Sequence, residues 1–66
     1  MKNRIRIERA VLNITQAELA DRVQVSRQTI NAIEAEKYSP SLALGMKIAR
    51  VFSKTTDEVF ELEEGD

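Results

Sequence analysis

Helix-capping signals divide this chain into short helices. Apolar residues in the first fifty positions recur at spacings of three and four rather than two, which indicates amphipathic helices. Thr15 precedes Glu18 by three positions, the spacing of a capping box, and predicts a helix over residues 16–23. Ser26 is a second N-cap residue and follows Val23 after a short turn, "QVS". The pattern therefore predicts two short helices joined by a tight turn.

Further helices are predicted on both sides of this pair. The first covers residues 4–13, and its expected inward-facing residues are Ile5, Leu12 and, in part, Ile7 and Val11. Pro40 breaks the chain and Ser41 caps a helix over residues 42–52, whose expected inner face is Leu42, Gly45, Ile48, Ala49 and Phe52. Thr55 or Thr56 caps a short fifth helix through Val59 and Phe60. We predict an all-α, five-helix fold.

The charges divide the chain into a basic body and an acidic tail. Residues 1–56 hold all ten basic residues and five acidic ones, a net charge of +5, whereas residues 57–66 carry −6. The tail sequence "FELEE" alternates, and "KNRIR" at the other end carries opposite charges. An antiparallel pairing of the two ends would place these charges opposite each other. The alternative is a frayed, solvated tail.

The composition excludes several classes of site. There is no Cys to form a disulfide or a thiolate metal site, and no His, the commonest general base and metal ligand. No apolar run approaches the roughly 20 residues needed to span a bilayer, and the charged amino terminus lacks the apolar segment of a signal peptide. We therefore expect a cytoplasmic protein that is not an enzyme and uses no metal, cofactor or small-molecule ligand.

The helix that follows Ser26 has two different sides. Thr29, Ile30 and Ile33 cluster on one side, and the opposite side presents Gln28, Asn31, Ala32 and Ala35, with Arg27 at its edge. Arg side chains match the O6 and N7 atoms of guanine, and Gln or Asn side chains match the N6 and N7 atoms of adenine. The pair of helices therefore predicts a helix-turn-helix whose second helix reads the DNA major groove. The alternative is an ordinary exposed polar face.

The stretch "TQAELADRVQVSRQTINAIE" resembles the helix-turn-helix of the phage Cro/repressor (XRE-type) transcription regulators. The segments "KYSPSLALGMKIARVF" and "DEVF" resemble the rest of that five-helix fold, so the likeness covers residues 3 to about 60. The segments "SRQTINAIE" and "KYSPSL" most resemble a short subgroup of the family that includes a homodimeric cytolysin-operon repressor. The resemblance implies a single DNA-binding domain over residues 1–66, with the helix-turn-helix at about residues 15–35 and the acidic tail at 57–66.

The resemblance also implies roles for individual residues. Gln16 is similar to the family residue that binds a phosphate and braces the recognition helix, and Arg9 and Glu34 resemble a buried ion pair joining the first and third helices. The expected DNA-binding residues are Gln16, Ser26, Arg27, Gln28, Thr29, Asn31, Lys37 and Tyr38.

This sequence departs from the family pattern at four places. Glu8 stands where an apolar residue is expected, with Ile7 beside it, which leaves the register of the first helix open. Gln24 stands where the turn usually has Gly, and it would be strained if that position needs a positive φ. Ala35–Glu36 replaces a common Asn-Gly ending, and Gly45 replaces an Ala. None of these changes removes a capping residue or the polar stripe.

These observations together predict a homodimeric regulator, most simply a repressor, that binds a palindromic site on double-stranded DNA. The apolar residues left over for a dimer interface are Leu44, Met46, Val51, Val59, Phe60 and Leu62. Two other functions remain open: an antitoxin that binds its own promoter and a toxin, and a protein-interaction module without DNA binding.

Overall fold

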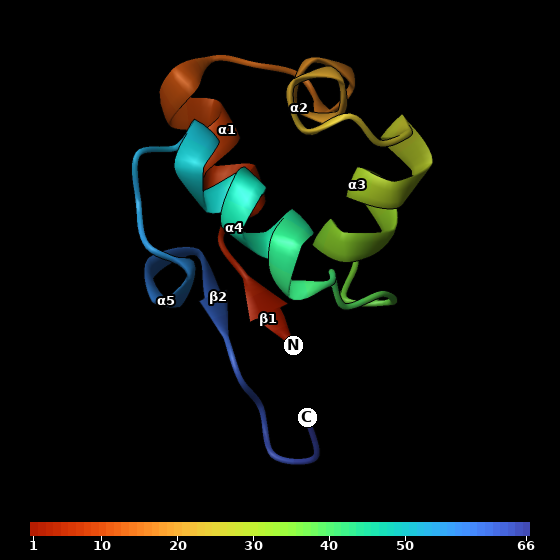
Figure 1. Ribbon diagram of the computed structural model, residues 1–66, viewed down its shortest axis with the longest axis vertical. Helices are drawn as coiled ribbons and strands as arrows, with labels where there is room; N and C mark the ends of the chain where they lie inside the picture. Colours follow the sequence, from red (N-terminus) through yellow and green to blue (C-terminus); the bar gives the residue numbers. More distant parts are fainter.

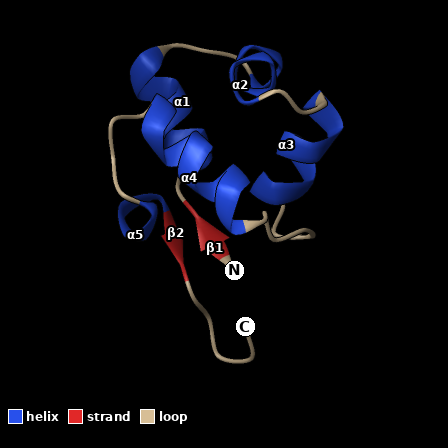
Figure 2. Cartoon of the chain, in the orientation of Figure 1, coloured by secondary structure: helices blue, strands red, loops and turns tan.

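The computed structural model describes residues 1–66 and contains five helices and a two-stranded antiparallel sheet (Figures 1 and 2). The elements along the chain are β1 (Lys2–Asn3), α1 (Ile5–Leu12), α2 (Gln16–Val23), α3 (Arg27–Glu34), α4 (Leu42–Val51), α5 (Thr56–Val59) and β2 (Phe60–Glu61). The predicted five-helix fold and the pairing of the two ends are therefore confirmed. No helix is long and apolar enough to cross a bilayer.

Four of the five helices begin at a hydroxyl side chain that accepts a hydrogen bond from the backbone. Thr15 Oγ1 accepts from the N–H of Glu18 at 3.0 Å, and the Glu18 carboxylate accepts from the N–H of Thr15 at 3.1 Å. Ser26 and Ser41 cap α3 and α4, and Thr55 forms a second capping box with Glu58. Each bond satisfies an N–H that the helix itself leaves unpaired, so the predicted caps locate the helix starts correctly.

All five helices contribute to one hydrophobic core. Ile5, Leu19, Ile30, Ile33 and Ile48 are fully buried or nearly so. The other core residues are Ile14, Ala20, Val23, Leu44, Ala49, Phe52 and Val59. Helix α2 packs against both α3 and α4, and α4 packs against α5. The core therefore fixes α2 and α3 relative to each other from their inner sides.

The predicted inner face of α1 is confirmed at Ile5, which is fully buried, and wrong at the other three residues. Ile7, Val11 and Leu12 are 52%, 74% and 43% exposed, whereas Glu8 is buried beside Ile5. Ile7 and Val11 lie on the side of the helix turned away from Ile5, because each residue rotates by about 100°. Leu12 shares the inner side with Ile5 but ends the helix, and Ile14 occupies the core beyond it.

Two residues predicted for a dimer interface lie in the core instead. Leu44 is 9% exposed and Val59 is 1% exposed. The buried side of α4 consists of Leu44, Gly45, Ile48 and Ala49. Leu42 lies at the edge of this side and on the first turn of the helix. The sequence predicts that it faces inward, but it is 77% exposed. Leu44 and Val59 are therefore unavailable to a second chain, and Leu42 joins the exposed apolar residues.

The sheet joins the two ends of the chain. Lys2 pairs with Glu61 and Asn3 pairs with Phe60, and the Arg4 N–H donates to the Val59 carbonyl at 2.8 Å. We call residues 2–3 and 60–61 the terminal ribbon. It is shorter than the sequence pattern suggests, because Arg4 already precedes α1.

The acidic tail folds back onto the amino terminus. The Met1 ammonium lies 3.3 Å from a carboxylate oxygen of Glu63 and of Asp66. Partial burial lowers the pKa of this ammonium, but the bonds to Asp66 and Glu63 outweigh it and raise the pKa above its usual value. In Figure 1 the tail lies at the bottom of the molecule, whereas α2 and the start of α3 lie at the top.

Four non-glycine residues have a positive φ: Asn13, Gln24, Glu36 and Ser53, with values between 56° and 62°. Each follows one of the first four helices, where the left-handed conformation lets the chain turn away. The suspected strain at Gln24 is therefore present, and Glu36 repeats it where the chain leaves α3. Asn tolerates this conformation better than the other three residues do.

Replacing Gln24 by Gly should raise the free energy of unfolding by about 0.5–1 kcal/mol, because Gly adopts a positive φ without steric cost. Ser53→Gly should behave in the same way. The measurement is thermal unfolding. The control is Ala17→Gly, at an exposed position inside α2, which should lower stability by about 1 kcal/mol. Equal destabilisation by Gln24→Gly and Ala17→Gly would contradict the strain.

Candidate nucleic-acid interface

Helices α2 and α3 form a rigid pair joined by residues 24–26. Leu19, Ala20 and Val23 of α2 and Ile30 and Ile33 of α3 are all buried in the core. The Ser26 hydroxyl accepts from the Thr29 N–H at 3.2 Å and lies 3.0 Å from the Thr29 hydroxyl. The first turn of α3 is thus held by its own cap, and its outer side faces solvent.

The predicted base-reading residues lie on that outer side. Arg27, Gln28 and Asn31 are exposed, and neither Arg27 nor Gln28 makes a side-chain hydrogen bond within the chain. Their donors and acceptors are consequently available to a partner. Ala32, between them and the core, is small enough to let another surface approach the helix axis closely.

Gln16 and Asn31 connect the two helices on the exposed side. Gln16 Nε2 donates to Asn31 Oδ1 at 3.3 Å. The structure thus brings together two of the predicted DNA-binding residues, one from the start of α2 and one from the middle of α3. The bond restricts both side chains before any ligand is present, which reduces the entropy lost on binding.

Lys37 and Tyr38 are exposed in the segment that follows α3. Glu36, with its positive φ, directs the chain away from the helix just before them. The structure therefore places these two predicted residues beyond the carboxyl end of α3, whereas Arg27 and Gln28 lie at its amino end.

Arg9 and Glu34 form a bidentate ion pair between α1 and the end of α3. Arg9 Nε donates to Glu34 Oε2 at 2.8 Å and Arg9 Nη2 donates to Glu34 Oε1 at 3.0 Å. Arg9 Nη1 also donates to the Ile14 carbonyl at 3.2 Å. The hydrogen bonds to Glu34 raise the pKa of Arg9. Because the Glu34 side chain is only 2% exposed, the pair is well shielded from water.

Two contacts at this end of α3 were not predicted. Arg6 lies 3.7 Å from Glu34 but its side chain is 81% exposed. Asn3 Nδ2 donates to the Ile33 carbonyl at 2.9 Å, and Asn3 Oδ1 accepts from the Ile5 N–H at 3.2 Å. An Asn just before a helix is a capping signal in the sequence, but its partner thirty positions away is not visible there.

Comparison with known proteins identifies a helix-turn-helix domain over nearly the whole chain. A helix-turn-helix family model matches residues 5–59. An uncharacterized HTH-type transcriptional regulator of Methanocaldococcus jannaschii is 47% identical over 66 residues and covers all of both chains. Another from Archaeoglobus fulgidus is 50% identical over 64 residues, 97% of this chain and 90% of that one. A third, from Bacillus subtilis, is 45% identical over 64 residues, 97% of each chain.

Proposed function

This chain belongs to the helix-turn-helix family of the Cro/repressor (XRE) type, a family of DNA-binding transcriptional regulators, and on that premise we propose that it is a repressor. It acts as one DNA-binding domain that inserts α3 into the major groove, and two copies bind a palindromic operator. The observation that carries the proposal is the pair Arg27 and Gln28, exposed and unbonded on the first turn of a helix that α2 and the core hold in place. In helix-turn-helix proteins these amino-terminal positions contact base edges.

The remaining predicted residues fit a backbone-binding role around this contact. Gln16 begins α2, where free N–H groups and the helix dipole favour a phosphate. Lys37 and Tyr38 lie beyond the other end of α3 and would hold the flanking phosphates. Phosphate contacts position a protein on DNA, whereas base contacts give specificity.

Arg27→Ala and Gln28→Ala should each weaken operator binding by about 1–3 kcal/mol and relax the choice at particular base pairs. Lys37→Ala should instead weaken binding to all sequences about equally. The operator is first obtained by selecting bound DNA from a random pool, and affinities are then measured by gel shift on operator and random DNA. Equal losses on both DNAs for Gln28→Ala would contradict its role. If the wild-type protein selects no sequence from the pool, the result would support the alternative function, a protein-interaction module without DNA binding.

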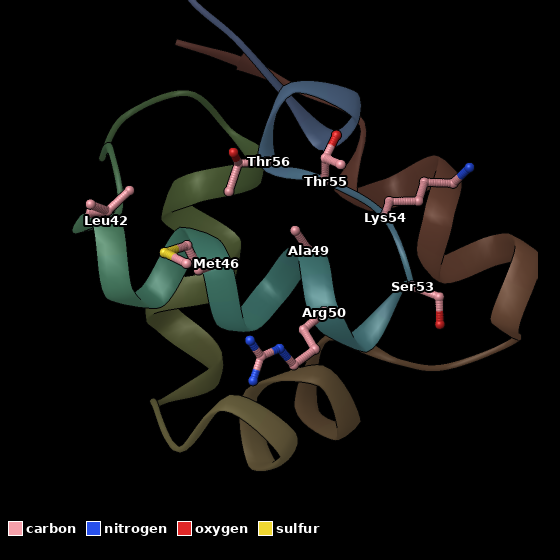
Figure 3. Close-up of a pocket in the computed structure, with 8 residues that line it drawn as sticks. All are labelled: Leu42, Met46, Ala49, Arg50, Ser53, Lys54, Thr55 and Thr56. Atoms are coloured by element: carbon pink, nitrogen blue, oxygen red, sulfur yellow. The ribbon is translucent and has the colours of Figure 1, made fainter.

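The structure revises the dimer face that the sequence suggested. We define the α4–tail face as Leu42, Met46, Phe60 and Leu62, of which Leu42 and Leu62 are 77% exposed and Met46 is 49% exposed. Figure 3 shows the side chains of Leu42 and Met46 on one side of α4, at a hollow that continues toward Thr55, which caps α5, and Thr56, the first residue of α5. A neighbouring hollow of about 270 Å³ is lined by Pro40, Leu42, Phe60 and Leu62. A second copy of this chain is the occupant we propose, because a two-fold operator requires two recognition helices.

Met46→Lys, alone or with Leu42→Lys, should convert the dimer to a monomer, because a charge in the centre of an apolar interface loses its water. Sedimentation at micromolar concentration measures the result. Val11→Lys is the matched control, since Val11 is equally apolar, is 74% exposed and lies on α1. A monomeric wild-type protein would contradict the dimer, and dissociation by Val11→Lys but not Met46→Lys would move the interface to α1.

A further inference from the structure

Asn3 connects the amino-terminal end of the chain to the end of α3. Its side chain uses both polar groups, donating to the Ile33 carbonyl at 2.9 Å and accepting from the Ile5 N–H at 3.2 Å. The residue is only partly exposed, so water competes poorly for these bonds. Asn3 thus links the paired ends of the chain to α3. None of the residues predicted for the site makes this link.

The carbonyl that Asn3 binds lies where the chain leaves α3. The Ile33 oxygen also accepts from the Glu36 N–H at 3.0 Å, and Glu36 has a φ of 62°. The usual Gly that would make this turn without strain is absent. Asn3 therefore provides a second donor at a helix end whose backbone is strained.

The terminal ribbon fixes the position of Asn3 itself. Asn3 pairs with Phe60, and the following residue, Arg4, donates its N–H to the Val59 carbonyl at 2.8 Å. The Met1 ammonium adds contacts to Glu63 and Asp66 in the tail. The end of α3 is thus attached, through one side chain, to a structure that forms only when both ends of the chain meet.

A short helix held at one end transmits its angle to the other. Helix α3 has eight residues, so it is about 12 Å long, and a small tilt at Ile33 displaces the first turn. Bidentate contacts to base edges require fixed geometry, whereas contacts of long side chains to phosphates tolerate small shifts. A change at Asn3 should consequently affect the choice of sequence more than general affinity for DNA.

We propose that Asn3 is a positioning residue for DNA recognition: it ties the end of α3 to the terminal ribbon and so sets the angle at which Arg27 and Gln28 meet the bases. This inference rests on the DNA-binding function proposed above. Asn3 itself contacts no base, and its effect passes through the Ile33 carbonyl.

Two variants with different chemistry test this role. Asn3→Leu keeps a branched side chain with the same number of heavy atoms but has no hydrogen-bonding group, and Asn3→Asp keeps the acceptor for the Ile5 N–H but turns an oxygen toward the Ile33 carbonyl. Ala10→Gly is the control for simple loss of stability, because it weakens α1 at an exposed position that belongs neither to the predicted DNA-binding residues nor to the α4–tail face. Affinities for operator and random DNA are measured well below the melting temperature of each variant.

Both Asn3 variants should lower the ratio of operator to random-DNA affinity by about tenfold, whereas Ala10→Gly should preserve it. A purely structural role would lower the melting temperature and leave this ratio unchanged, which would overturn the proposal. A loss in Asn3→Asp alone would show an effect of charge and would overturn it as well.

Amide hydrogen exchange in the DNA-free protein tests the anchor independently. The Glu36 amide should exchange about tenfold faster in both Asn3 variants than in Ala10→Gly, because the turn after α3 opens more often once its attachment to the terminal ribbon is lost. Unchanged exchange would overturn the anchoring role whatever the DNA result. If the wild-type protein selects no operator, the proposed function fails, and the exchange data still decide whether Asn3 holds α3.

Discussion

Glu34→Gln is expected to lower the free energy of unfolding by about 3–5 kcal/mol, because it leaves the Arg9 guanidinium buried without a counter-charge. The Glu34 side chain is 2% exposed and that of Arg9 is 16% exposed, so water cannot replace the lost partner easily. A domain of this size has roughly 3–10 kcal/mol of total stability. The variant should therefore keep little stability at room temperature, and a measurable fraction of it should be unfolded.

Thermal unfolding measures this loss, at about 4–8 °C for each kcal/mol. Arg6→Ala is the matched control, since Arg6 is a second cation 3.7 Å from the same carboxylate but is 81% exposed. It should cost less than about 1 kcal/mol. Replacing both members of the pair, Arg9→Met with Glu34→Leu, should recover most of the loss. A melting temperature of Glu34→Gln within a few degrees of the wild type would mean that the pair contributes little.

Raising the salt concentration from about 50 to 300 mM should weaken operator binding by about a thousandfold or more. A dimer that neutralises roughly four to eight phosphates releases their counterions, and the logarithm of affinity should fall with that of salt at a slope of about −4 to −7. The +5 body supplies the charge, and the −6 tail lies at the opposite end of the molecule from α2 (Figure 1). A titration of the selected operator across this range gives the slope.

Two variants separate phosphate contacts from general electrostatics. Lys37→Ala should make the slope shallower by about two in the dimer, one phosphate contact for each copy. Glu63→Gln with Glu64→Gln should leave the slope unchanged, since the tail lies at the opposite end of the molecule from α2 (Figure 1). A slope near zero for the wild type would contradict charged contacts to phosphate, including the one assigned to Lys37.

Local signals explain what the sequence predicts well. The caps at Thr15, Ser26 and Ser41 each involve a donor three positions along, so the starts of α2, α3 and α4 can be identified from a few neighbouring residues. The separation of α3 into an apolar side and a polar side is equally local, because it depends only on helical rotation. These features are sufficient to predict the helix-turn-helix.

Features that depend on distant partners are harder to predict. The inner side of α1 holds Glu8 and Arg9 rather than an apolar stripe. Arg9 faces inward because it pairs with Glu34, which lies 25 positions later in the chain. Leu44 and Val59 are apolar residues of the kind that interfaces use, but the packing of α4 against α5 buries both. The contact of Asn3 is equally hard to predict, because its partner is a backbone carbonyl, which any residue could supply.

The terminal ribbon also affects the order in which this chain folds. Its pairing closes a loop that spans residues 2–61, and closing a long loop has an entropic cost that local helix formation avoids. The helices should form first and the ribbon last, so substitutions in the ribbon should accelerate unfolding while leaving the folding rate nearly unchanged. During synthesis, residues 2–3 must wait for residues 60–61 to leave the ribosome. The end of α3 therefore becomes fully fixed only at the final stage of translation of this domain.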